Sequence, residues 1–157
     1  MLRYRDTGAL HPDFHGTMNA TLEYLGSNHG QEALRAVFAA TAQNVYRSIY
    51  EKLRRGDLSE LIEHWRYYLE RENADYTLDA DDSGVTLTVK ACPAVAHVRR
   101  LGLTPSRYFC DQTIFLNEAW CEGTPFEAST TIIEEGHCIQ RILRRPCADG
   151  GEANDPQ

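Results

Sequence analysis

The segment SRYFCDQTIFLNEAWCEG carries the residue types that small-molecule chemistry requires. On a helix of 3.6 residues per turn its polar residues form two neighbouring stripes, Cys110, Asn117 and Cys121 on one and Asp111 and Glu118 on the other. A thiol, an amide and a carboxylate along one wall suit addition of a nucleophile or water to an electrophilic carbon. Asp111, Asn117 and Cys121 would bind substrate, and the Glu118 carboxylate would move protons. The alternative is a core helix with an ordinary acidic surface.

Cys92 is a second candidate nucleophile, because it directly precedes Pro93 at the expected start of a helix. The partial positive charge of a helix N-terminus favours a thiolate, and reactive cysteines require a lowered thiol pKa. Cysteine is also commonly a small buried hydrophobe, so packing at a strand end is the alternative interpretation.

The stretch HPDFHGTMNATLEYLG near the N-terminus has a polar edge of four side chains spaced by four residues, namely His11, His15, Asn19 and Glu23. We expect His15 to serve as a base and Asn19 to orient the substrate, provided that this helix packs against the helix carrying Cys110 and Asn117. Gly16 would then mark the point of close approach. A solvated helix edge is the alternative.

The spacing of the cysteines argues against a metal site. From Cys92 to Cys138 they are 18, 11 and 17 residues apart, with no C-x-x-C pair, and the two histidines of H-x-x-x-H at His11 lack a third ligand. We therefore expect no metal and no cofactor, and keep a metal-binding protein as a third hypothesis. The other histidines are expected on the surface or in loops: His29, His64, His97 and His137. For His97 the alternative is a position facing the same pocket as Cys92.

The elements that position these residues follow from hydrophobic periodicity and turn residues. Helical spacing predicts three helices in the first half, at residues 11–26, 31–53 and 57–73, the second and third opened by the capping pairs Asn28 with Gln31 and Asp57 with Glu60. Gly26 is expected to end the first helix.

In the second half, alternation predicts a β-hairpin around the turn Asp81–Gly84. A short helix from Pro93 to Gly102 follows, and another runs from Pro105 to Cys121. Strands at 126–133 and 138–143 complete the pattern. We expect one α+β domain at 1–145, with an antiparallel sheet of about four strands and helices packed on one face, and a disordered tail at 146–157.

Composition limits the partners. The chain of 157 residues has a net charge of -7 and no basic run beyond paired arginines, so nucleic acid is an unsuitable partner. It contains no apolar stretch of membrane-spanning length and no signal peptide, and its odd count of 5 cysteines indicates reduced thiols. We expect a cytoplasmic protein with a small-molecule substrate, and a homo-oligomer stays open.

The runs CPAVAHVRRLG, FCDQTIFLNEAWCEG and GHCIQRI, with a strand beginning near Phe126, resemble the L-2-amino-thiazoline-4-carboxylic acid hydrolase family. The resemblance covers roughly residues 13–143. It implies ring-opening hydrolysis of a cyclic amidine-like C=N bond, as in converting an aminothiazoline carboxylate to an N-carbamoyl amino acid. The residues that match by position are Cys92, Cys110, Cys121 and Cys138, with Asp111 and Glu118 as acid/base candidates.

Two functional hypotheses follow. The first is a hydrolase of cyclic C–N bonds in which Cys92 or Cys110 attacks or lines the pocket, and Glu118 or His15 is the base. The second is a non-catalytic small-molecule-binding module, because the order of helices and strands is also distantly similar to domains of the vinyl reductase type. The second hypothesis predicts a buried apolar cavity and saturable binding without a product.

Overall fold

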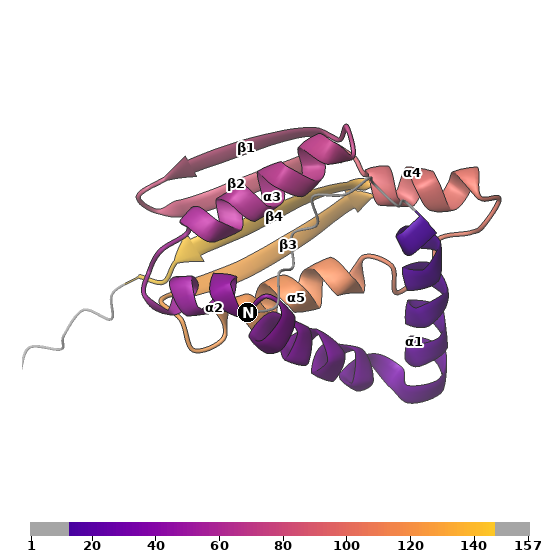
Figure 1. Cartoon of the computed structure of the whole chain (residues 1–157), viewed down its shortest axis with the longest axis horizontal. Helices are drawn as coiled ribbons and strands as arrows, with labels where there is room; N and C mark the ends of the chain where they lie inside the picture. The colour runs from indigo at the N-terminus through magenta and orange to yellow at the C-terminus, as the bar shows by residue number, and fades with distance from the viewer. Residues whose placement is uncertain (1–12, 147–157) are drawn as a thin grey trace, which may run out of the picture.

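The computed structural model describes residues 13–146, which form five α-helices, one π-helical turn and one four-stranded antiparallel sheet (Figure 1). The helices are α1 (Asp13–Ala40), α2 (Arg47–Arg54), α3 (Ser59–Arg71), α4 (Pro93–Arg100) and α5 (Asp111–Cys121), with the π-helical turn η1 at Thr41–Val45. The strands are β1 (Asp75–Asp81), β2 (Gly84–Ala91), β3 (Phe126–Glu134) and β4 (His137–Arg144). The predicted α+β fold is confirmed. His11 and the predicted tail beyond Pro146 lie outside the described residues.

The sheet has the strand order β1-β2-β4-β3, so each predicted hairpin forms and the two join through β2 and β4. Val85, Leu87 and Val89 of β2 are buried, whereas the threonines between them are partly exposed. This alternation places one face under the helices and leaves the other face open. At the β1–β2 turn Gly84 has a φ of 149°, and a Cβ there would lie 2.2 Å from the Ile142 carbonyl oxygen.

The core consists of two clusters of buried side chains that meet at one junction. The first joins the covered face of the sheet to α2, α3 and α5, and the second joins α1 to α4 and the start of α5. Cys92 and Leu116 are partly buried against both clusters. The candidate site described below lies at this junction.

Helix α1 is longer than predicted, because Gly26 does not end it. The helix continues to Ala40 and bends at Gly30, whose φ of 78° and ψ of 176° are non-helical (Figure 1). Gly26 is instead buried under Tyr108, where a Cβ would lie 2.4 Å from ring carbons. Gly16 meets Leu101 after α4 rather than α5, so the predicted point of close approach is wrong.

The predicted second helix at 31–53 is interrupted. The Thr41 hydroxyl donates to the Val37 carbonyl and the Asn44 amide donates to the Ala40 carbonyl, both four residues back. Such side-chain bonds compete with the helical ladder and bend it, and the chain passes through η1 before α2 begins. The predicted cap at Asn28 is also wrong, because its amide donates within the helix to the Tyr24 carbonyl.

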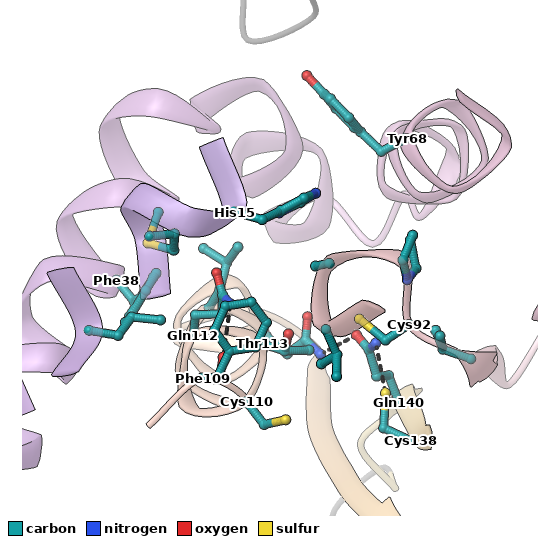
Figure 2. Close-up of a pocket in the computed structure, with 18 of the residues that line it drawn as sticks. His15, Phe38, Tyr68, Cys92, Phe109, Cys110, Gln112, Thr113, Cys138 and Gln140 are labelled. Carbon is teal, nitrogen blue, oxygen red and sulfur yellow. Dashed lines mark hydrogen bonds between the residues drawn. The ribbon is translucent and has the colours of Figure 1, made fainter. Parts of the chain in front are cut away.

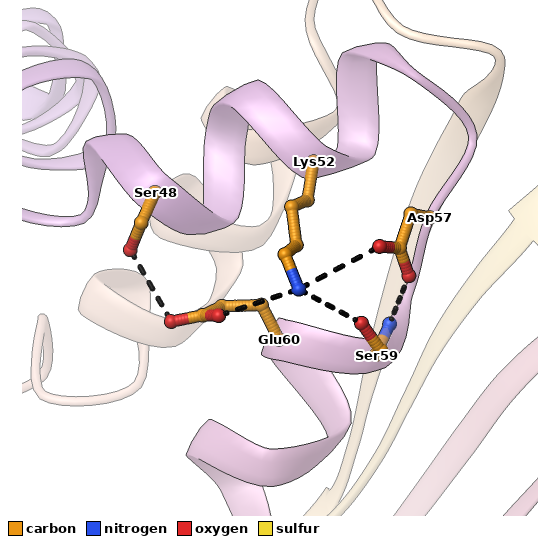
Figure 3. Close-up of polar contacts among 5 residues, drawn as sticks. All are labelled: Ser48, Lys52, Asp57, Ser59 and Glu60. Carbon is orange, nitrogen blue, oxygen red and sulfur yellow. Dashed lines mark hydrogen bonds and ion pairs between the residues drawn. The ribbon is translucent and has the colours of Figure 1, made fainter.

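The junction between α2 and α3 is held by a polar cluster around Lys52 (Figure 3). The Lys52 ammonium lies 3.7 Å from carboxylate oxygens of Asp57 and Glu60, and donates to the Ser59 hydroxyl at 3.2 Å. The Asp57 carboxylate accepts the Ser59 backbone N–H at 2.8 Å, one position before Leu58, which caps α3. These bonds hold the pKa of Asp57 below its usual value.

Helix α4 and the final hairpin match their predictions, and α5 does not begin where predicted. α5 starts at Asp111 because the segment before it is bound to α1: Asn19 donates to the Thr104 carbonyl at 3.1 Å and accepts the Ser106 N–H at 2.7 Å. In the described part of the chain, every helix falls short of the length or apolarity that a membrane crossing requires.

Candidate functional site

A cavity of about 590 Å³ lies between the helices and the covered face of the sheet (Figure 2). Most of its lining is apolar or aromatic, and its walls come from helices α1, α3, α4 and α5, from the turn η1 and from strands β2, β3 and β4. Its volume falls within the roughly 300–1,000 Å³ that small-molecule sites occupy. In Figure 2 His15 and Tyr68 lie on one side of the cavity, and Cys92, Cys110 and Cys138 lie on the other.

Three thiols from three separate elements line the cavity. Cys92 precedes α4, Cys110 precedes α5, and Cys138 lies on β4. The Cys92 backbone N–H donates to the Gly136 carbonyl at 2.8 Å, which joins the end of β2 to the turn before β4. The three cysteines thus converge although 46 positions of sequence separate the first from the last.

These thiols are protonated at neutral pH. Burial raises the pKa of Cys92 and Cys138, and it raises the pKa of Cys110 to about 11 with a further contribution from the neighbouring thiols. Backbone N–H groups at the start of α4 act in the opposite direction on Cys92 but do not offset its burial. Because the thiolate is the nucleophile, the surroundings do not activate these cysteines.

His15 and Glu72 form a hydrogen-bonded pair in the cavity lining. The His15 Nε2 lies 2.9 Å from the Glu72 Oε2, and the two side chains are 15% and 17% exposed. With a proton on Nε2 the imidazole donates to the carboxylate and keeps Nδ1 as a proton acceptor. The pair therefore has the arrangement of a base held in place by a carboxylate.

An amide network closes the sheet side of the cavity. Asn117 donates to the Thr130 hydroxyl at 3.2 Å and to the Gln140 side-chain oxygen at 2.9 Å. Gln140 in turn donates to the Cys138 sulfur at 3.5 Å. Both amide N–H groups of the buried Asn117 thus donate to protein groups. These bonds tie α5 to β3 and β4 and satisfy the polar side chain of this asparagine in the interior.

One end of the cavity is aromatic. The rings of Tyr46, His64, Tyr68 and Trp120 pack edge to face, with centroid separations of 4.8 to 5.8 Å. Trp120 is 1% exposed, and among residues 13–146 its indole N–H has no hydrogen-bond acceptor. A buried donor without an acceptor is costly to the folded state.

The tertiary structure brings together four of the eight residues that the sequence singled out, because His15, Cys92, Cys110 and Asn117 all line the cavity. Asn19 does not line it, since its side chain holds the segment before α5. Asp111 also lies outside, where its carboxylate accepts a hydrogen bond from the Gln31 side chain.

The remaining two candidates lie on the far side of α5. Glu118 is exposed and pairs with Arg35 of α1, whose guanidinium carbon lies 4.0 Å from the centre of the Phe115 ring. Cys121 belongs to the first core cluster, and burial raises its pKa to about 12. The Cys110–Asn117–Cys121 stripe therefore does not face one pocket along its whole length.

Three histidines differ from the prediction of surface positions. His64 is buried in the aromatic end of the cavity, because α3 turns the face of His64 and Tyr68 inward. His97 is buried with its Nε2 3.6 Å from the Asp13 carboxylate. His137 is partly buried and lines the cavity, whereas His29 is exposed as expected but lies in α1.

Glu72, Gln140 and Trp120 were not anticipated as site residues. Glu72 follows His64 and Tyr68 at intervals of four residues, so the stripe of α3 contained a signal for it. Gln140 interrupts an otherwise apolar alternation in its strand, which is a weaker signal. Trp120 gave no signal, because a tryptophan on an apolar helix face is ordinarily a core residue.

No cluster of three or more histidine, cysteine, aspartate or glutamate side chains within residues 13–146 is arranged to hold a metal ion. The chain was also compared with protein-family models, curated proteins and solved structures, and none of them matched.

Proposed function

We propose that this chain binds a small, mainly apolar organic molecule in the cavity between its helices and its sheet. The observation that carries the proposal is the cavity itself, which combines a volume of about 590 Å³, an apolar and aromatic lining and a few polar groups. That combination is typical of small-molecule sites.

Binding can be tested with N-phenyl-1-naphthylamine, an uncharged fluorophore that brightens in apolar surroundings. The purified chain should show saturable enhancement at one site per chain. Thr113→Phe should weaken binding by about tenfold or more, because Thr113 lines the cavity and the added ring would occupy it.

Thr131→Phe is the matched control, since Thr131 lies on β3 with an exposed side chain outside the cavity lining. The control should bind as the wild type does. Absence of saturable binding in the wild type, or equal loss in the two variants, would reject the proposal.

The second candidate function is hydrolysis of a C–N bond in a small cyclic substrate, and one observation favours it. The His15–Glu72 pair lines the same cavity and has the geometry of an oriented general base. The raised pKa values of the thiols argue for water rather than cysteine as the nucleophile. The family resemblance of the second half of the sequence points to the same reaction class.

The chemistry would proceed by addition and collapse. The oxygen of water bonds to the carbon of a cyclic C=N bond while His15 takes one proton and passes it to the nitrogen. The tetrahedral adduct then collapses to a carbonyl as the bond from this carbon to the ring sulfur breaks, and the hydroxyl proton goes to the departing sulfur. The product has gained one water.

Incubation with 2-amino-2-thiazoline, with and without a 4-carboxylate, tests this candidate by mass spectrometry. His15→Gln should abolish formation of the hydrated product, whereas Cys92→Ser and Cys110→Ser should retain it. No product from the wild type would reject hydrolysis of these rings and leave binding unaffected.

A further inference from the structure

Apart from histidines, the charged side chains that line the cavity in the described part of the chain are carboxylates. Among residues 13–146, no lysine or arginine lines it, whereas two carboxylates do, Glu72 and Glu134. Two histidines of the lining face these carboxylates: His15 lies 2.9 Å from Glu72, and His137 lies 4.0 Å from Glu134. An anionic ligand buried there would therefore meet no lysine or arginine of residues 13–146, and burial of an unpaired charge is strongly unfavourable.

Glu72 borders the aromatic end of this cavity. It follows Tyr68 by four residues, and its backbone N–H donates to the Tyr68 carbonyl at 3.1 Å, so the two side chains leave neighbouring turns on the same face. The described contact of the Glu72 carboxylate with His15 is made by Oε2. The second oxygen can accept a bond from a ligand without displacing the imidazole.

A carboxylate beside aromatic rings is the arrangement that stabilises an organic cation. The carboxylate provides a charge-assisted hydrogen bond, and the faces of tyrosine and tryptophan attract positive charge. Tyr68 supplies such a ring beside Glu72, and Tyr46 and Trp120 continue the aromatic lining. The apolar remainder of the cavity would receive the body of the same molecule.

We propose that the cavity selects an organic cation, an amine or amidine with an apolar body, whose charged end lies against Glu72 and Tyr68, and that it rejects carboxylates of the same shape. This inference rests on the proposed binding function. It also narrows the substrates of the proposed hydrolase. A protonated 2-aminothiazoline is an organic cation of this kind, whereas its 4-carboxylate carries a negative charge.

Three naphthalene probes of similar size test the inference: 2-naphthylmethylamine, 2-naphthylmethanol and 2-naphthoate. Each is titrated against bound N-phenyl-1-naphthylamine at neutral pH, where the first is a cation, the second neutral and the third an anion. We expect the amine to bind about tenfold more tightly than the alcohol, and the naphthoate about tenfold more weakly.

Glu72→Gln should reduce the affinity for the amine to that for the alcohol while leaving the alcohol within about twofold of its wild-type affinity, since only the charge has been removed. Glu118→Gln is the matched control, because it removes the same charge from an exposed residue outside the cavity. It should keep the preference for the amine.

The outcomes separate the two claims. Naphthoate binding as tightly as the alcohol, or an amine preference that survives Glu72→Gln, would overturn the inference and leave the binding function standing. Failure of the fluorophore and of all three probes to bind would overturn the binding function and the inference together.

Discussion

The contact between Gly26 and Tyr108 allows a prediction in which two opposing effects are compared. Gly26 lies inside α1, where replacing glycine by alanine ordinarily stabilises a helix by about 1 kcal/mol. A Cβ at this position would lie 2.4 Å from two carbons of the Tyr108 ring, whereas carbon atoms pack at about 3.5–4.0 Å. The ring must therefore move by about 1 Å or more, and such overpacking costs about 1–3 kcal/mol.

We expect Gly26→Ala to lower the free energy of unfolding by about 0–2 kcal/mol, the difference between these effects. The effect of Gly26→Ala on the free energy of unfolding should change sign when the Tyr108 ring is removed. In a Tyr108→Ala background the same substitution should stabilise the chain by about 0.5–1 kcal/mol, because only the helix preference remains.

A double-mutant cycle measures the contact directly. Urea unfolding of the four proteins, followed by far-ultraviolet circular dichroism, should give a coupling energy of about 1–3 kcal/mol between positions 26 and 108. If Gly26→Ala stabilises both backgrounds equally, α1 does not approach Tyr108 as described. Tyr108 lies two residues before Cys110, so that result would also displace the thiol side of the cavity.

Two further predictions concern the segment before α5 and the state of its cysteine. Asn19→Ala should lower the free energy of unfolding by about 1–3 kcal/mol, because it leaves the Thr104 carbonyl and the Ser106 N–H without their partner, and a loss below about 0.5 kcal/mol would contradict that role. Cys110 should react with iodoacetamide at a rate that keeps rising up to pH about 11, because burial favours the neutral thiol and raises its pKa above the usual value near 9. The alkylation of Cys110 can be followed by peptide mass spectrometry. A rate that levels off below pH 9 would show that burial does not raise the pKa of this thiol.

Two elements in the second half of the fold could be predicted closely because their signals are local. The β1–β2 hairpin follows from alternation and the turn at Asp81–Gly84, and α4 follows from Pro93 and Gly102. In each case residues a few positions apart determine the backbone, so no distant contact is needed to place the element.

The errors arose where a residue has its effect through a distant partner. Glycine is typical of a helix end, yet Gly26 lies inside α1. Its missing side chain allows the ring of Tyr108, 82 positions later, to approach. Proline and serine are typical of a helix start, which led to the prediction at Pro105 and Ser106. Asn19 instead binds the backbone there, and α5 begins at Asp111. His64 could face solvent or core on periodicity alone, and the packing of Tyr46 and Trp120 decides that it is buried.

The candidate site was also predicted only in part from local sequence, and the rest depended on distant contacts. The sequence by itself determined the type and order of the elements, and it identified the thiols, His15 and Asn117 as unusual for their positions. Only the tertiary structure decided that His15 lies beside Glu72, 57 positions away, that Cys92, Cys110 and Cys138 line one cavity, and that Glu118 and Cys121 do not. The physical reason is that periodicity fixes the angle of a side chain about its own helix or strand, whereas the face that is buried depends on which elements pack against it.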